Sequence, residues 1–188
     1  MELAGERIIR ADRATVWAAL NDPDVLKACI PGCERLEKLS DTEMEAEVTQ
    51  KVGPVKAKFK GQVTLEDIRP AEGYFLSGEG KGGTAGFAKG GARVDLSDHP
   101  EGTLLTYKAE ARVGGKLAQL GSRLIDGFAR KMADEFFALF QQQVEAAAPR
   151  PEAAARVLPE PTAARTPEMA GAPAPEPEKK GWLRRLIS

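Results

Sequence analysis

The stretch VKAKFKGQVTLEDI, residues 55–68, decides the fold because its apolar and polar residues alternate along most of its length. One face carries Val55, Ala57, Phe59, Val63 and Leu65, and the other carries Lys56, Lys58, Lys60, Gln62 and Glu66. A repeat of two residues predicts an antiparallel strand with one face buried and the other in water.

Segments with the same character flank this strand on both sides. EMEAEVTQKV precedes it, and YFLSGEG, FAKGGARVDL and TLLTYKAEARV follow it, with turn sequences VGPV, KGGTAG and SDHPEG between segments. Short polar or glycine-containing turns between alternating segments predict a meander of antiparallel strands.

Helices are predicted before and after the strands. A short helix begins after Asp12, and a second begins after Asp22 with Pro23 in its first turn, where the missing N–H costs little. A long amphipathic helix is predicted over residues 115–147. Its expected apolar stripe consists of Leu117, Leu120, Leu124, Phe128, Met132 and Leu139.

This order of elements predicts an α+β domain of the helix-grip type. In that fold, a six- to seven-stranded antiparallel sheet wraps around one long C-terminal helix, and an apolar cavity lies between them. Inward positions that carry small residues, above all Ala88, Gly90 and Ala92, would leave such a cavity unfilled. The alternatives are close packing of helix on sheet, or a bulge at Gly90–Gly91. The predicted ligand-binding residues are Trp17, Phe59, Val63, Leu65, Ala88, Gly90, Ala92, Leu120, Gly121, Leu124 and Phe128.

Several kinds of site are not expected. Gly78, Gly80 and Gly83 match the G-x-G-x-x-G pattern, but strands rather than a helix follow them, so no nucleotide site is predicted. Cys29 and Cys33 lack the further ligands that a zinc site needs, so we expect two reduced thiols, no metal and no intrinsic cofactor. His99 lies in a polar turn, and no catalytic residues are predicted. The net charge of −1 gives no reason to expect nucleic acid as a partner.

Four blocks of the sequence are distinctive: VWAALNDPDVLKACIPGCERLE, KVGPVKAKFKGQVTL, GEGKGGTAGFAKGGARVDL and GGKLAQLGSRLIDG. They resemble the family of carbon monoxide dehydrogenase G subunits, within the START and Bet v 1-like group of lipid-binding domains. The resemblance covers residues 1–147. It implies a helix-grip fold, a cytoplasmic accessory role beside a molybdenum-containing carbon monoxide dehydrogenase or related hydroxylase, and a pocket for a respiratory quinone. It also implies attachment to the inner face of the cytoplasmic membrane.

Composition divides the chain into three parts. Residues 1–148 are the predicted domain, and residues 149–178 form a Pro/Ala/Glu-rich segment of the kind expected to be a disordered tether. Residues 179–188 return to apolar and basic side chains, which predicts an amphipathic tip that binds a membrane surface weakly. Its membrane-contacting residues would be Lys179, Lys180, Trp182, Leu183, Arg184, Arg185, Leu186 and Ile187. No sequence long and apolar enough to span a bilayer as a helix is found, and no secretion signal is recognised.

Three functions remain open at this point. The protein could carry a quinone or another lipophilic molecule between the membrane and the dehydrogenase. It could instead be an adaptor that only recruits the dehydrogenase to the membrane. A hydrolase or cyclase of the same superfamily is the third reading, which the apolar character of the inward-facing positions disfavours.

Overall fold

The computed structural model describes residues 1–148, and the predicted tether and tip lie outside them. In chain order the elements are β1 (Glu2–Ile9), α1 (Arg13–Leu20), α2 (Pro23–Cys29), β2 (Cys33–Lys38), β3 (Glu43–Val52), β4 (Val55–Arg69), β5 (Gly73–Lys81), η1 (Gly83–Ala85), β6 (Phe87–His99), β7 (Gly102–Gly114), η2 (Ala118–Leu120) and α3 (Ser122–Ala147). Here η denotes a short 3-10 helix.

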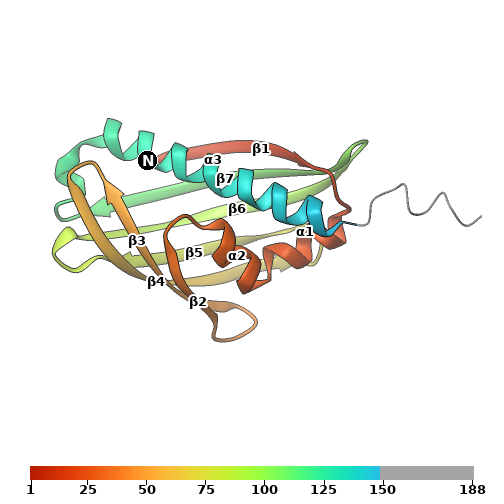
Figure 1. Cartoon of the computed structure of the whole chain (residues 1–188), viewed down its shortest axis with the longest axis horizontal. Coiled ribbons are helices and arrows are strands. Elements are labelled where there is room, and N and C mark those ends of the chain that lie inside the picture. The colour runs from red at the N-terminus through yellow and green to blue at the C-terminus, as the bar shows by residue number, and fades with distance from the viewer. Residues whose placement is uncertain (149–188) are drawn as a thin grey trace, which may run out of the picture. The chain divides into compact units, whose positions relative to one another are not determined.

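The strands form one antiparallel sheet in the order β1-β7-β6-β5-β4-β3-β2. The three predicted turns join neighbouring strands: Val52 pairs with Val55, Lys81 with Phe87, and His99 with Gly102. Figure 1 shows α3 lying across one face of the curved sheet, with α1 and α2 beside its C-terminal half. The predicted α+β helix-grip fold with a six- to seven-stranded sheet is therefore confirmed, with seven strands.

The two short helices begin where the sequence predicts. The Asp12 carboxylate accepts a hydrogen bond from the Thr15 N–H at 2.9 Å, and Asp22 accepts one from the Asp24 N–H at 2.8 Å. Each carboxylate thereby satisfies an N–H group that has no partner within the helix.

The long helix differs from the prediction in its start and in its buried face. Gly115 and Gly121 have φ of 71° and 84°, which a continuous helix cannot accommodate, so α3 begins at Ser122. Leu124 and Leu139, predicted for the apolar stripe, are 39% and 37% exposed. The fully buried residues of the helix are Ile125, Phe137, Phe140 and Val144. The predicted stripe was therefore wrong at Leu124 and Leu139, whereas Leu117 is buried and Phe128 and Met132 face the sheet side. The break at Gly121 changes the rotation of α3 relative to the leucines that precede it.

Buried apolar side chains form two clusters rather than one. The larger includes Ile9, Val16, Leu105 and Phe140, each 0% exposed. The smaller contains Val52, Leu117 and Ile125, where the β3–β4 hairpin meets the start of α3.

Candidate ligand-binding site

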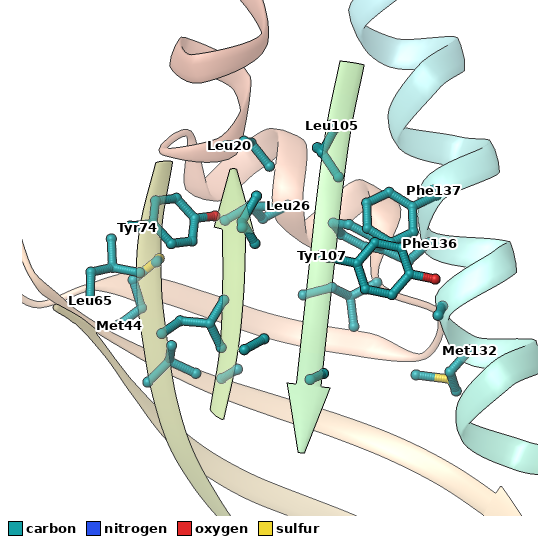
Figure 2. Close-up of a pocket in the computed structure, with 18 of the residues that line it drawn as sticks. Leu20, Leu26, Met44, Leu65, Tyr74, Leu105, Tyr107, Met132, Phe136 and Phe137 are labelled. Atoms are coloured by element: carbon teal, nitrogen blue, oxygen red, sulfur yellow. The ribbon is translucent and has the colours of Figure 1, made fainter. Parts of the chain in front are cut away.

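A cavity of about 400 Å³ lies between the inner face of the sheet and the helices. All seven strands and all three α-helices contribute to its wall, and Figure 2 shows α3 aromatic side chains facing residues of the sheet. The lining residues are Leu3, Leu20, Leu26, Ile30, Pro31, Leu36, Met44, Ala46, Val63, Leu65, Tyr74, Leu76, Ala92, Val94, Leu105, Tyr107, Ala109, Met132, Ala133, Phe136 and Phe137. We refer to it as the large cavity.

Only two of these side chains, Tyr74 and Tyr107, carry a nitrogen or an oxygen atom. Every other lining side chain is aliphatic, aromatic or a thioether. A cavity with this wall favours an apolar molecule, and its two hydroxyls are the side-chain groups that could orient a polar atom of that molecule.

Tyr74 lies on β5 and is 4% exposed. Its ring packs against Trp17, with 5.6 Å between the ring centroids. No hydrogen bond joins its hydroxyl to another residue in the part of the chain that the structure describes. Burial raises the pKa of Tyr74, so the hydroxyl stays protonated and remains a donor. Figure 2 shows this hydroxyl directed from β5 toward Leu26.

Tyr107 lies on β7 on the α3 side of the large cavity. Its ring stacks on Phe137 with centroids 4.6 Å apart, and the Arg7 guanidinium lies 5.6 Å from the Phe137 centroid. Gly5, its partner on β1, leaves room for the ring, because a Cβ there would lie 2.6 Å from the Tyr107 hydroxyl.

A second cavity of about 320 Å³ continues along the same face of the sheet. Its lining residues are Met1, Gln50, Val52, Phe59, Ala88, Ala111, Val113, Leu117, Ile125, Phe128, Ala129 and Met132. Met132 borders both cavities, and on the sheet side Ala92 and Ala109 line the large cavity while Ala88 and Ala111 line the second. The two cavities are thus neighbouring parts of one apolar trough between sheet and helix.

The predicted ligand-binding residues fall into three groups: some line the large cavity, some line the second cavity, and some line neither. Val63, Leu65 and Ala92 line the large cavity, and Phe59, Ala88 and Phe128 line the second. The remaining predicted residues, Trp17, Gly90, Leu120, Gly121 and Leu124, line neither.

Gly90 occupies an inward position on β6, where the absence of a side chain allows the β6 and β7 backbones to approach closely. A Cβ at this position would lie 2.1 Å from the Glu110 carbonyl oxygen, so β6 and β7 approach each other too closely for any side chain. The β5–β6 and β6–β7 registers run without interruption through Gly90 and Gly91, which excludes the bulge considered from the sequence.

Sequence reasoning missed the two tyrosines and the aromatic residues Phe136 and Phe137. The alternation that places Ala92 and Val94 inward also places Tyr74 and Leu76 inward on β5, and Leu105, Tyr107 and Ala109 inward on β7. The alternation of inward and outward residues along β5 and β7 could therefore have predicted both tyrosines. The sequence analysis instead searched for small inward residues, which selected only β6 among these three strands.

Comparison with known proteins identifies the family. Residues 5–145 match the family described as the G subunit of carbon monoxide dehydrogenase (CoxG). The chain belongs to the CoxG family. No curated protein sequence matches this chain.

Solved structures agree with the fold. A conserved protein from Geobacillus kaustophilus is 31% identical with a TM-score of 0.73, over 78% of this chain and 97% of that one. A protein from Thermus thermophilus is 16% identical with a TM-score of 0.61, over 79% and 100% of the two chains. The Zhui aromatase/cyclase from a Streptomyces species is 11% identical with a TM-score of 0.56, over 77% and 93%. The last two show the fold alone.

The two cysteines of this CoxG-family chain lie apart from the cavity lining. Cys29 is buried and Cys33 is half-buried, both are free thiols, and burial raises the pKa of each. Within residues 1–148, no group of three or more His, Cys, Asp or Glu side chains is placed to hold a metal ion. The same residues include no helix long and apolar enough to cross a membrane.

Proposed function

We propose that this CoxG-family domain binds a respiratory quinone in the large cavity. The observation that carries the proposal is an apolar cavity of about 400 Å³ whose only side-chain oxygens are the hydroxyls of Tyr74 and Tyr107. Its volume is within the range of roughly 300–1,000 Å³ found for small-molecule sites.

The residues present fit the chemistry of a quinone. A quinone has carbonyl oxygens that accept hydrogen bonds, and its remaining surface is apolar. The buried hydroxyl of Tyr74 is a donor without a protein partner among the described residues, so a quinone carbonyl would satisfy it. Met132, Phe136 and Phe137 offer apolar surface to the ring and tail. When bound, a quinone supplies a reversible two-electron, two-proton acceptor, and the protein residues hold it and exclude water.

The wider role follows from the family description. We infer that the protein is an accessory subunit that links a molybdenum-containing carbon monoxide dehydrogenase, or a related hydroxylase, to the electron-transport chain at the inner face of the cytoplasmic membrane. Residues 149–178 would act as the tether and residues 179–188 as the membrane-contacting tip. This assignment rests on the family name and the composition of those segments.

The adaptor reading would leave the cavity without a purpose. An unfilled cavity lowers stability by about 24 cal/mol per Å³. The hydrolase or cyclase reading draws on a neighbour that shares only the fold. Ligand binding accounts for these features more directly.

Binding of a short-chain quinone to the purified full chain tests the proposal. Ala92 faces the large cavity between Leu76 on β5 and Ala109 on β7, so Ala92→Phe would place a ring in the ligand's volume. We expect Ala92→Phe to lower quinone affinity at least tenfold while its melting temperature stays unchanged or rises. Ala4→Phe is the matched control, because Ala4 is exposed on β1. Equal quinone binding by the parent and both variants would contradict the site, and so would no measurable binding by the parent.

A further inference from the structure

One end of the sheet is rich in positive charge. The segments 50–60, 80–92 and 111–125 contain nine lysines and arginines and no aspartate or glutamate. These basic residues are Lys51, Lys56, Lys58, Lys60, Lys81, Lys89, Arg112, Lys116 and Arg123, and all are exposed.

The three segments meet at the same end of the domain. They contain the β3–β4 turn, the β5–η1–β6 connection and the β7–η2–α3 connection, which Figure 1 shows together at its left side. The Leu117 N–H donates a hydrogen bond to the Ala85 carbonyl at 3.1 Å. The Leu124 side chain lies against the β3–β4 turn, since a Cβ at Gly53 would be 3.3 Å from it. We call this surface the basic end.

Like charges stand opposite one another across the strands of the basic end. Lys51 pairs in register with Lys56, Lys60 with Lys81, and Lys89 with Arg112. On their other neighbouring strand Lys60 faces Glu47 and Lys89 faces Glu79, whereas the Lys51–Lys56 pair faces no acidic residue in the registers of the described strands. Directly opposed like charges destabilise an antiparallel pair, and the two glutamates offset this repulsion only in part. An anionic partner would relieve the repulsion.

Acidic side chains neutralise only part of this charge. Lys58 and Lys60 form salt bridges with Glu34 and Glu47, and Lys81 forms one with Glu79. The other six basic residues form none with any residue from 1 to 148.

Acidic residues gather at the opposite end of the domain. The α1–α2 junction carries Asp22 and Asp24, and the β6–β7 hairpin carries Asp95, Asp98 and Glu101. Asp95 and Asp98 form salt bridges with Arg69 and Arg13, whereas Asp22, Asp24 and Glu101 form none within residues 1–148. A separation of charge along the molecule turns the basic end toward an anionic surface before contact.

Apolar side chains and the second cavity belong to the same end. Phe87 and Leu124 are 45% and 39% exposed among the basic residues. Ala88, Leu117 and Ile125, from the same segments, line the second cavity, and Met1 both lines it and is 39% exposed. The apolar trough therefore extends to the basic end and reaches the surface beside it.

We propose that the basic end docks on an anionic lipid bilayer and brings the second cavity against the membrane. Lysines and arginines would contact lipid phosphates while Phe87 and Leu124 enter the headgroup region. An acidic protein could also meet the charge. The bilayer is favoured because exposed apolar side chains lie among the charges, and because an apolar ligand could pass from the acyl chains into the trough without crossing water. The inference rests on the proposed function only in requiring an apolar ligand.

Vesicle co-sedimentation of the full chain, without added quinone, tests the docking surface. The vesicles contain phosphatidylcholine with about one third phosphatidylglycerol, or phosphatidylcholine alone. The variant is Lys51→Gln/Lys56→Gln/Lys89→Gln. The control, Lys27→Gln/Lys108→Gln/Lys131→Gln, removes the same charge from exposed positions outside the basic end. Because a basic residue near such a surface changes affinity about fivefold, the variant is expected to bind the anionic vesicles about a hundredfold more weakly than the parent.

Two further measurements complete the test. The control is expected to stay within a few fold of the parent, and Phe87→Ser is expected to weaken binding without changing net charge. Equal binding by the parent and the Lys51/Lys56/Lys89 variant, or no preference of the parent for anionic vesicles, would overturn the proposal. Since no quinone is present, that failure would leave the ligand proposal untouched.

Discussion

At the scale of the residue, Tyr74 is the most informative side chain of the domain. It is 4% exposed, its hydroxyl has no hydrogen-bond partner within residues 1–148, and it borders a cavity whose only other side-chain oxygen is the Tyr107 hydroxyl. A ligand oxygen that accepts from the Tyr74 hydroxyl would add a hydrogen bond that the protein alone does not make, which contributes about 0.5–1.5 kcal/mol.

Tyr74→Phe is expected to separate ligand recognition from folding. The ring and its packing on Trp17 remain, so the melting temperature is expected to stay the same or rise. The affinity for a quinone is expected to fall about two- to tenfold, because one hydrogen bond contributes about 0.5–1.5 kcal/mol. Isothermal titration calorimetry measures this, with a hydrocarbon that has no acceptor as the comparison ligand. A similar loss for both ligands would show that the change acts through cavity shape.

At the scale of the element, the helix starts are fixed by local chemistry and the buried face of α3 is not. Asp12 caps α1 through both its carboxylate oxygens, which accept from the Thr15 N–H and the Thr15 hydroxyl at 2.9 and 2.8 Å. These hydrogen bonds, first that from the Thr15 N–H, lower the pKa of Asp12. Only the packing of α3 on the sheet places Ile125, Phe137 and Phe140 inward.

Asp12→Ala is expected to destabilise the domain by about 1 kcal/mol at neutral pH, because α1 loses its cap. The pKa of Asp12 is lower in the folded than in the unfolded state, so its stabilisation is complete above the ordinary value of 3.8 and is lost as the pH falls through the lowered folded value. Urea unfolding measures this at pH 7 and at successively lower pH. The difference in free energy of unfolding between parent and variant is expected to narrow below about pH 4. Asp41→Ala, at a fully exposed position, is the control. A difference in free energy of unfolding that stays the same at the lowest pH would contradict the capping explanation.

At the scale of the whole molecule, charge and cavity are arranged along the same trough. The basic end includes the second cavity's residues Ala88 and Leu117, and the acidic loops lie at the other end of the sheet, beyond the large cavity. If the proposed docking is correct, the end with Asp22, Asp24 and Glu101 faces away from the bilayer.

Deletion of residues 179–188 is expected to weaken vesicle binding by the full chain, because the segment supplies four basic residues together with Trp182 and three aliphatic side chains. Each basic residue contributes about 1 kcal/mol near an anionic surface. Flotation of the deleted chain with anionic vesicles measures the remaining affinity, which we assign to the basic end. If flotation is unchanged by the deletion, these residues do not contact the membrane.

The sequence alone determined strands β3 to β7, their turns, the caps of α1 and α2, and the family. These features depend on residues that are close in the chain: alternation along a strand, a short turn, or a carboxylate two or three residues before an N–H group. The antiparallel meander followed from them, whereas β2 (Cys33–Lys38) was not among the predicted strands. The blocks that resemble the CoxG family also supplied the expectation of a pocket.

Only the tertiary structure decided which residues surround that pocket. Met132 on α3, Ala92 on β6 and Tyr74 on β5 come together because helix and sheet pack at a distance that leaves their side chains unable to fill the space. In the same structure the Leu124 side chain is exposed, and Gly90 lies where β6 and β7 are too close for any side chain. A cavity remains where side chains from elements distant in the chain do not reach one another. No local pattern in the sequence therefore specifies it.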